Sequence, residues 1–323
     1  MRTEGDAWDI TTGVGSTALF VAAARALGGD QEQALAEDPF AEDFLRAAGD
    51  EWAALLDGEA PEHPLTATEF GRDFQEFQVA RTKYFDDYFR DATAAEVRQV
   101  VILAAGLDAR AYRLPWPDGT VVYELDRPQV LEFKRNVLAD NGDKPRTDRR
   151  EVPVDLREDW PRALRESGFD PSAPTAWLAE GLLIYLPAAA VEQLFETIES
   201  LSAPGSRVAI EQMDPLPEEA AAALAENSGE ADAARNEWLG LIYYEPRSEA
   251  AGWFTARGWT AERVDVPDYL RAHGRPAPGG SGGAVSNMLS VVTAGRPGRR
   301  TSTASPPKPH RHCAFRSLSR AAP

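Results

Sequence analysis

The sequence predicts an α/β protein built on a doubly wound, mostly parallel sheet, and three observations lead to that prediction. From residue 96 onward, short apolar runs alternate with amphipathic segments, as strands and crossover helices do in such sheets. The first run, residues 100–103, is wholly apolar and largely β-branched, which is typical of a strand buried on both faces. Gly106 follows as a turn residue, and Pro115 ends the short helical piece after it.

Residues 1–95 are predicted to form an N-terminal helical cap. The Ala-rich residues 18–27 favour a helix, and Asp38 is placed to cap a second one. A longer helix is expected over residues 70–91, where aromatic side chains recur at spacings of three and four. Arg81 lies on or beside this aromatic stripe, so we expect its guanidinium to pair with a carboxylate or to reach toward solvent.

The rest of the chain continues the alternation. Further strands are expected over residues 121–125, 152–154, 176–179 and 208–213, with two closing strands over residues 260–266 and 286–293. Helices are expected over residues 128–139, from Asp159 to Gly168, from Pro187, and as a last helix over residues 253–258. The predicted α/β domain spans residues 96–295 and includes an acidic insertion, residues 214–250, placed to cover a substrate pocket. Residues 296–323 have the composition of a disordered basic tail.

Composition and charge exclude several classes of function. The net charge is −18, but residues 296–323 carry seven Lys/Arg and no Asp/Glu, so residues 1–295 have 34 − 7 = 27 basic and 52 acidic residues, a net −25. A body this acidic repels phosphate backbones, which argues against nucleic acid as a partner. The single cysteine, Cys313, and the scattered histidines argue against a metal site. No long apolar run and no signal-peptide core are evident, so we expect a cytoplasmic protein without membrane contact.

Four residues follow four successive predicted strands, at the edge where doubly wound sheets bind ligands: Gly106, Asp126, Asp155 and Glu180. Asp126 comes twenty residues after Gly106, a spacing at which a carboxylate can hold a ribose diol. Asp155 and the backbone of Leu156 would then meet the adenine. Each residue also has an ordinary structural interpretation, since Asp126 and Asp155 could cap helices and Glu180 could be solvated.

Several motifs occur in the order found in one known family. They are Val14-Gly-Ser-Thr-Ala-Leu19, Asp38-Pro-Phe40, Ala105-Gly-Leu-Asp-Ala-Arg-Ala-Tyr-Arg-Leu114, Tyr123-Glu-Leu-Asp126, Val154-Asp-Leu156 and Ala179-Glu-Gly-Leu-Leu-Ile-Tyr185. On these residues the chain resembles the leucine carboxyl methyltransferase family. It is more closely similar to a branch of S-adenosyl-L-methionine-dependent methyltransferases known from actinobacteria. The resemblance runs over residues 11–295.

The resemblance implies a class I methyltransferase (Rossmann-like) fold with an N-terminal helical cap and S-adenosyl-L-methionine as cofactor. It assigns Asp126 to the ribose, Asp155 and Leu156 to the adenine, Gly106 to the turn beneath the cofactor, Arg81 to the methionine carboxylate, and Glu180 to the acid after the fourth strand. The chain departs from the wider pattern at Ala104-Ala105-Gly106, where a single glycine stands in place of Gly-x-Gly. The expected reaction is in-line transfer of a methyl group to an oxygen, carboxylate or hydroxyl, of a small molecule. The sequence identifies no catalytic base.

Two other functions fit parts of the same pattern. An NAD-dependent oxidoreductase would use Ala104-x-Gly106-x-x-Ala109 as a degraded dinucleotide fingerprint, followed by the same acid twenty residues on. This alternative gives no role to Asp155 or Glu180, and the missing first glycine would crowd the turn. A non-catalytic regulatory protein would keep cofactor binding and use the acidic insertion as a contact surface.

Overall fold

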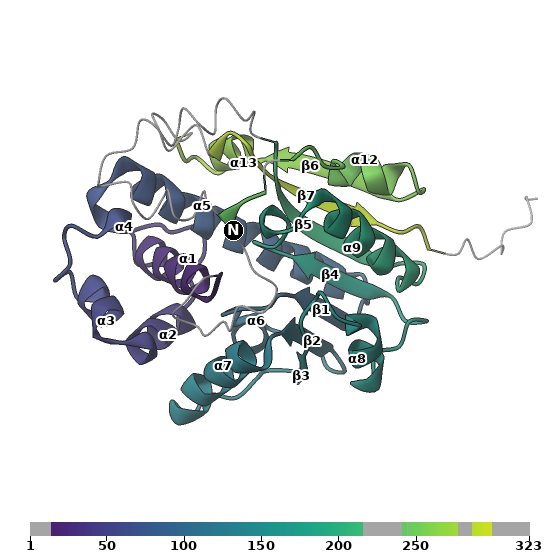
Figure 1. Cartoon of the computed structure of the whole chain (residues 1–323), viewed down its shortest axis with the longest axis horizontal. Helices are drawn as coiled ribbons and strands as arrows, with labels where there is room; N and C mark the ends of the chain where they lie inside the picture. The colour runs from purple at the N-terminus through teal and green to yellow at the C-terminus, as the bar shows by residue number, and fades with distance from the viewer. Residues whose placement is uncertain (1–13, 216–240, 244, 277–285, 299–323) are drawn as a thin grey trace, which may run out of the picture.

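The computed structural model describes residues 14–215, 241–243, 245–276 and 286–298. A seven-stranded sheet of order β3-β2-β1-β4-β5-β7-β6 forms its centre (Figure 1). The strands are β1 (Gln99–Leu103), β2 (Val121–Asp126), β3 (Asp148–Pro153), β4 (Thr175–Ala179), β5 (Arg207–Met213), β6 (Thr260–Asp265) and β7 (Leu289–Gly295). Most of the predicted insertion and nearly all of the predicted basic tail lie outside the described residues.

The strand order confirms the predicted doubly wound sheet. Strands β1 to β5 pair in parallel, whereas β7 runs antiparallel to both β5 and β6. The chain leaves β1 toward β2 and β3, then returns across β1 to β4 and β5 on its other side. The connection after β1 therefore runs to one side of the sheet and the connection after β4 runs to the other. This arrangement opens a crevice between the carboxyl ends of the two strands.

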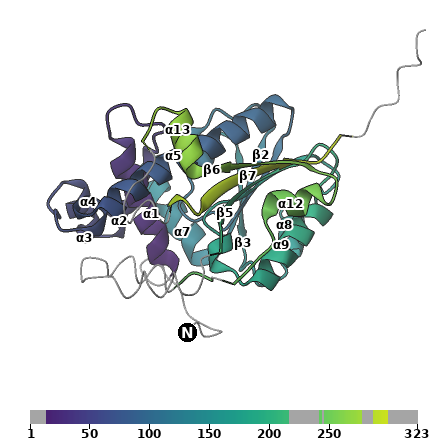
Figure 2. The same ribbon diagram turned by 90° about the horizontal axis from the view of Figure 1, so that it is seen from above.

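Helices cover both faces of the sheet, because successive side chains of a strand point to opposite sides. Val100 and Ile102 of β1 belong to the core that includes α5 and α13, while Val101 and Leu103 pack with α8, α9 and α12 (Figure 2). These helices are α5 (Glu69–Ala94), α8 (Trp160–Glu166), α9 (Ala188–Ser200), α12 (Ala250–Thr255) and α13 (Val266–Ala272), and α6 (Arg110–Arg113) and α7 (Pro128–Asp140) connect β1, β2 and β3. Burial on both faces explains why β1 reads as a continuous apolar run.

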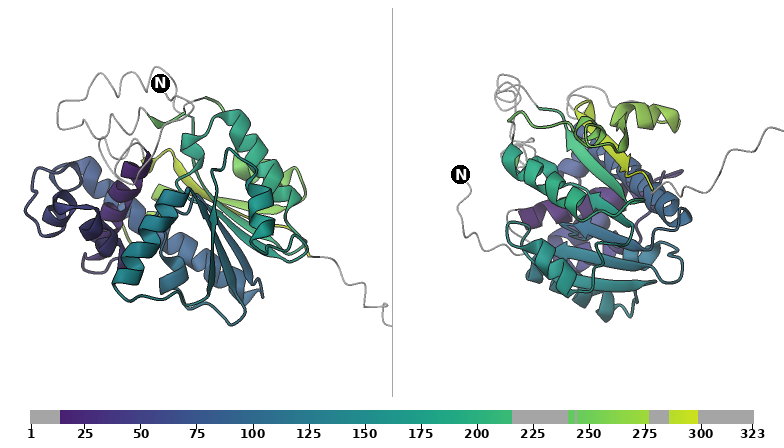
Figure 3. Two further views of the ribbon diagram at one scale, coloured as in Figure 1. Left: turned by 60° about the horizontal axis from the view of Figure 1, so that its bottom comes forward. Right: turned by 90° about the vertical axis from the view of Figure 1, so that its right-hand side faces the viewer.

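The N-terminal helices that precede α5 gather beside the sheet, where α1 and α4 contact α5 (Figure 3). They are α1 (Val14–Gly29), α2 (Phe40–Ala48), α3 (Asp50–Leu56) and α4 (Pro64–Ala67). Helix α5 begins at the Thr68 cap, whose hydroxyl accepts a hydrogen bond from the Gly71 N–H (2.9 Å). A Cβ atom at Gly71 would lie 2.2 Å from the Pro64 carbonyl oxygen, so only glycine allows α4 and α5 to approach this closely.

The structure differs from the sequence-based expectation at three elements. Strand β3 begins at Asp148, not at residue 152, because its first residues are charged and half-exposed at a sheet edge and carry no apolar signal. The helix expected over residues 253–258 is α12, which begins at Ala250, and it is not the last one. Helix α13 follows β6, between the two predicted closing strands, where no helix was predicted, and its Val266 and Leu270 are buried one turn apart.

Within the described ranges, no helix combines the length and apolarity needed to cross a bilayer.

Candidate functional site

A cavity of about 940 Å³ opens at the carboxyl ends of β1, β2 and β4 and extends along α5 and α1. This volume lies near the upper limit of the roughly 300–1,000 Å³ typical of small-molecule sites. All six residues predicted to bind the cofactor line it: Arg81, Gly106, Asp126, Asp155, Leu156 and Glu180. The fold therefore brings together residues that lie up to 99 positions apart in the sequence (180 − 81 = 99).

The turn after β1 presents its backbone to the Asp126 carboxylate. The Gly106 N–H donates to Asp126 Oδ2 (2.7 Å), and the Arg127 N–H donates to Oδ1 (2.7 Å). A carboxylate oxygen has room for a second hydrogen bond, so both oxygens can still accept from a diol in the cavity. Burial raises the pKa of Asp126, and these two backbone hydrogen bonds oppose the increase.

Ala104 occupies the position of the first glycine in the Gly-x-Gly pattern and adopts a backbone conformation that favours glycine. Its φ angle is +50°, and that of Gly106 is +49°, so the turn uses the left-handed conformation twice. A Cβ atom at Gly106 would meet only the Ala104 carbonyl oxygen, at 3.9 Å. The chain leaves open space above Gly106, as close approach of a ligand to the backbone requires.

Arg81 is buried between two carboxylates, that of Glu180 directly after β4 and that of Glu211 within β5. Its Nη1 donates to Glu211 Oε2 (2.6 Å), and its Nε lies 3.0 Å from Glu180 Oε1. Burial lowers the pKa of Arg81, but the charges of Glu211 and Glu180 outweigh that effect and raise it overall. The pairing with Glu180 joins two residues that the sequence singled out. The sequence-based prediction did not include Glu211, although a glutamate inside a buried strand is a usable signal.

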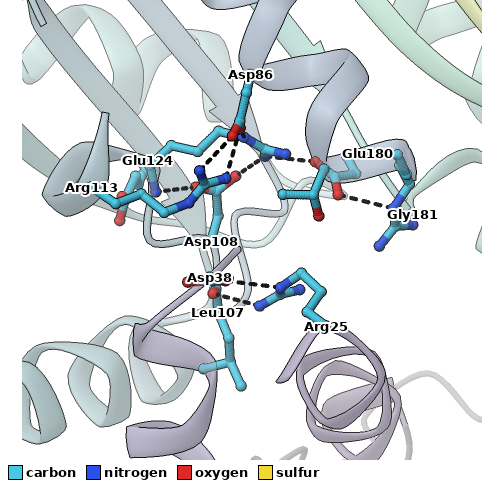
Figure 4. Close-up of polar contacts among 12 residues, drawn as sticks. Arg25, Asp38, Asp86, Leu107, Asp108, Arg113, Glu124, Glu180 and Gly181 are labelled. Carbon is cyan, nitrogen blue, oxygen red and sulfur yellow. Dashed lines mark hydrogen bonds and ion pairs between the residues drawn. The ribbon is translucent and has the colours of Figure 1, made fainter. Parts of the chain in front are cut away.

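Two further arginines of the cavity wall, Arg110 and Arg113, continue this charged cluster, and Figure 4 shows Arg113 beside Asp86. Arg110 Nη1 donates to Glu180 Oε2 (2.6 Å), and its Nε donates to Asp86 Oδ1 (2.8 Å). Arg113 Nη2 also donates to Asp86 Oδ1 (2.7 Å), and Arg110 pairs in addition with Asp108. Asp108, Arg110 and Arg113 belong to the motif that follows β1. Charged residues in such an apolar segment are a signal in the sequence for buried ion pairs.

Asp155 is already engaged by two arginines. Its Oδ2 accepts from Arg127 Nη2 (3.0 Å) and Arg157 Nη2 (2.6 Å), and its Oδ1 accepts from the Arg157 N–H (2.9 Å). Hydrogen bonds from Arg157 hold the pKa of Asp155 well below its usual value. The Arg157 side chain is 60% exposed, so its ion pair with Asp155 can break at little cost.

The charges of the cluster suit the cofactor expected from the sequence. Arg81, Arg110 and Arg113 face four carboxylates, those of Asp86, Asp108, Glu180 and Glu211, which leaves one net negative charge. S-adenosylmethionine carries a sulfonium, an ammonium and a carboxylate, and so one net positive charge. Among the described residues, no group of His, Cys, Asp or Glu side chains is arranged to hold a metal ion.

The fold and the cavity define a class I methyltransferase, with a 3-2-1-4-5-7-6 sheet, an antiparallel β7, and a turn and an acid after β1 and β2. The model of the leucine carboxyl methyltransferase family matches residues 18–199, more than half of the chain. The chain belongs to the leucine carboxyl methyltransferase family, and it is an S-adenosyl-L-methionine-dependent methyltransferase.

Relatives in mycobacteria support this assignment. A protein of Mycobacterium bovis BCG, named "Putative S-adenosyl-L-methionine-dependent methyltransferase", is 58% identical over 301 residues, which cover 92% of this chain and 100% of that protein. A Mycolicibacterium smegmatis protein of the same name is 59% identical over 283 residues, 86% of this chain and 93% of its own length. A solved structure of a "putative methyltransferase" from Thermobifida fusca YX is 19% identical, with a TM-score of 0.49, and covers 86% of this chain and 94% of that one.

Proposed function

We propose that the protein transfers the methyl group of S-adenosylmethionine to an oxygen atom of a small molecule. The observation that carries this proposal is that one continuous cavity joins the predicted cofactor residues to a largely apolar space walled by α5 and α1. The predicted cofactor residues line one part of this cavity, and side chains of α5 and α1 line the rest. A small acceptor beside the cofactor accounts for the rest of the space.

The cofactor, when bound, supplies a methyl group on a sulfonium centre that leaves as a neutral thioether. Asp126 accepts hydrogen bonds from the ribose diol, with its free lone pairs directed into the cavity. Leu156 would pack against the adenine, and Asp155 would accept a hydrogen bond from the adenine amino group in place of the one from Arg157. Glu180 and Arg81 hold the ammonium and the carboxylate of the methionine end, since each lines the cavity and is fixed by the other.

Alignment is the main task left to the chain's own residues. A displacement at a methyl carbon needs the attacking oxygen held in line with the departing sulfur, and it needs water excluded. The buried ion pairs in the cavity wall fix Arg81 and Glu180 rigidly, because moving either would leave an unpaired buried charge.

Calorimetric titration with S-adenosylhomocysteine tests the cofactor site directly. Asp126→Ala removes the hydrogen bonds to the ribose, so binding is expected to weaken by roughly 1.5–3 kcal/mol, at least about tenfold. Asp140→Ala, an exposed carboxylate at the end of α7 outside the cavity, is the matched control and is expected to leave binding unchanged. Equal affinities for the wild type and Asp126→Ala would contradict the ribose assignment.

Mass analysis of the methylated product tests the oxygen assignment. Incubation with S-adenosylmethionine and a panel of hydroxyl, carboxyl, amine and thiol compounds is expected to give a methyl ether or a methyl ester. Methylation confined to nitrogen or sulfur would contradict the proposal.

A further inference from the structure

The cavity extends beyond the predicted cofactor residues, along the N-terminal half of α5. Three phenylalanines of this helix line it there, Phe70, Phe74 and Phe77, and their rings contact one another at centroid distances of 5.8 and 6.2 Å. Two polar residues interrupt this aromatic wall, Asp73 and Gln78. Arg81 lies on the same helix, three residues after Gln78, or about 4.5 Å along the helix axis. The aromatic region therefore adjoins the site proposed for the methionine end of the cofactor.

Gln78 is 1% exposed and lines the cavity, and its Oε1 has no hydrogen-bond partner among the described residues. An unsatisfied amide oxygen in a buried position costs about 1–3 kcal/mol. A ligand that donates a hydrogen bond here would recover that cost. A hydroxyl group fits best, because it both donates and accepts and so complements the amide in either orientation.

Asp73 is a half-buried carboxylate without an ion-pair partner in the part of the chain that the structure describes, and its Oδ2 is fully covered and unbonded. Burial raises the pKa of Asp73, the charges of Glu69 and Glu76 add to the increase, and the charge of Arg72 opposes it. Glu158, at the adenine side, also lines the cavity without a described partner, but it is exposed to solvent. Asp73 therefore brings to the aromatic region a carboxylate that forms no close ion pair with a described residue.

The cations of the cavity wall are all compensated. Each lining arginine in the described ranges forms an ion pair with a carboxylate: Arg25 with Asp38, Arg81 with Glu180 and Glu211, Arg110 with Asp86, Arg113 with Asp86, and Arg127 and Arg157 with Asp155. No described lysine lines the cavity. An acceptor carboxylate would find no uncompensated positive charge there, and it would face the charge of Asp73.

We propose that Gln78 and Asp73 make this region the binding site for a neutral acceptor with an aromatic body and a hydroxyl group, and exclude carboxylate acceptors. This inference rests on the proposed function. The aromatic body packs against the phenylalanines of α5, and Gln78 Oε1 accepts a hydrogen bond from the hydroxyl group. Asp73 rejects anions and receives the proton that the reaction releases.

The transfer balances with Asp73 as the proton acceptor. The hydroxyl oxygen forms a bond to the methyl carbon while the carbon–sulfur bond breaks, and the bonding electron pair leaves with sulfur. The methylated oxygen then carries the positive charge, and its proton passes to the Asp73 carboxylate, because a protonated ether is a far stronger acid than a carboxylic acid. The products are a methyl ether, S-adenosylhomocysteine and a protonated Asp73 that returns its proton to solvent.

Two probes with the same apolar body test the proposal, 4-phenylphenol and biphenyl-4-carboxylate. Their affinities are measured by calorimetry on the full chain saturated with S-adenosylhomocysteine, and turnover is measured with S-adenosylmethionine. We expect 4-phenylphenol to bind at least tenfold more tightly than the carboxylate and to be converted to its methyl ether.

Three variants separate the roles. Asp73→Asn is expected to reduce the preference for the phenol to less than threefold and to slow ether formation at least tenfold. Gln78→Met, which keeps the length of the side chain, is expected to weaken phenol binding about fivefold. Glu69→Gln removes a charge one turn from Asp73, from an exposed residue outside the cavity, and is expected to leave the preference within about twofold. S-adenosylhomocysteine affinity should be equal in all three, which verifies folding.

Equal binding of the two probes, or a preference that Asp73→Asn does not alter, would overturn the proposal. So would the absence of binding by both probes in a protein that binds S-adenosylhomocysteine. Failure to bind S-adenosylhomocysteine at all would instead contradict the proposed function on which the inference rests.

Discussion

Ala104 has a backbone conformation that an L-residue adopts at a cost of about 1–2 kcal/mol, with φ at +50°. It stands where the wider methyltransferase pattern has a glycine, so the sequence changes at this position while the geometry of the turn is kept. The strain persists because the Ala105 N–H donates to the Leu125 carbonyl oxygen (2.9 Å), which fixes the turn to the end of β2. A pattern search that requires Gly-x-Gly misses this turn, whereas the spacing between Gly106 and Asp126 does not.

Replacing Ala104 by glycine is expected to stabilise the protein. Glycine removes the left-handed strain but gives the unfolded chain more freedom, so we expect a net gain of about 0.5–1 kcal/mol in the free energy of unfolding. Urea denaturation followed by circular dichroism measures the change. Ala105→Gly is the control, since Ala105 is buried and not in the left-handed region, and it should destabilise the protein. A loss of stability in Ala104→Gly would contradict the strain argument.

At the scale of elements, the sequence predicts well what the hydrophobic pattern encodes. Strand β1 and helices α5, α7 and α9 were predicted to within a few residues, because each buries a continuous or periodic set of apolar side chains. The pattern fails for β3, whose first residues are charged, and for the seven-residue helix α13, which is too short for a periodic signal. Both are held by neighbouring elements, and a local pattern does not report such support.

Helix α7 is attached to the sheet through a buried lysine. Lys134 is fully buried, and its Nζ lies 2.7 Å from Glu124 Oε2 of β2 and donates to the Asp108 carbonyl oxygen (2.9 Å). Arg149 of β3 pairs with the same Glu124 oxygen at 2.6 Å. One carboxylate thus joins a helix and two strands directly below the turn that carries Gly106.

Lys134→Met is expected to lower the free energy of unfolding by about 3 kcal/mol, since it breaks a buried ion pair and leaves the Asp108 carbonyl oxygen without its donor. The double variant Glu124→Gln/Lys134→Met should lose less than the sum of the two single changes, by at least about 1 kcal/mol. Denaturant titration of all three variants measures this coupling. Arg135→Met removes the exposed ion pair of the adjacent residue with Glu151, and it should lower the free energy of unfolding by less than about 1 kcal/mol. Additive losses would show that the pair is not coupled.

Across the whole molecule, the charged cluster in the cavity wall joins parts of the chain that are far apart in the sequence. Arg81 and Glu211 are 130 residues apart, and Arg110 and Glu180 are 70 residues apart. The sequence allowed us to predict that Arg81 and Glu180 belong to a site, since each stands next to a recognisable element. It did not allow their pairing to be predicted, because the choice among many acidic residues depends on the packing of α5 against the sheet.

The pKa values of the buried carboxyl groups are shifted in opposite directions. We therefore expect acidification to weaken cofactor binding at a higher pH than the pH at which it unfolds the protein. Burial raises the pKa values of Asp86 and Asp108, but nearby cationic side chains outweigh burial and hold both below their usual values. Their stabilising contribution is therefore present above the unfolded pKa of about 3.9 and is lost only as pH falls through the lower folded values. Asp126 has the opposite direction, because burial raises its pKa. The free protein takes up a proton at Asp126 that the complex excludes, so S-adenosylhomocysteine affinity should fall at a higher pH than the one at which the protein unfolds.

Calorimetric affinities and melting temperatures measured from pH 7.5 down to pH 4.5 test this order. We expect the affinity for S-adenosylhomocysteine to decrease within this range. The melting temperature should stay nearly constant over the same range, because Asp86 and Asp108 remain ionised. Asp126→Asn carries no titrating carboxyl group, so its weaker binding should lose most of this pH dependence. If affinity and melting temperature decreased together, or if Asp126→Asn kept the pH dependence of the wild type, Asp126 would not be the group that links proton uptake to cofactor release.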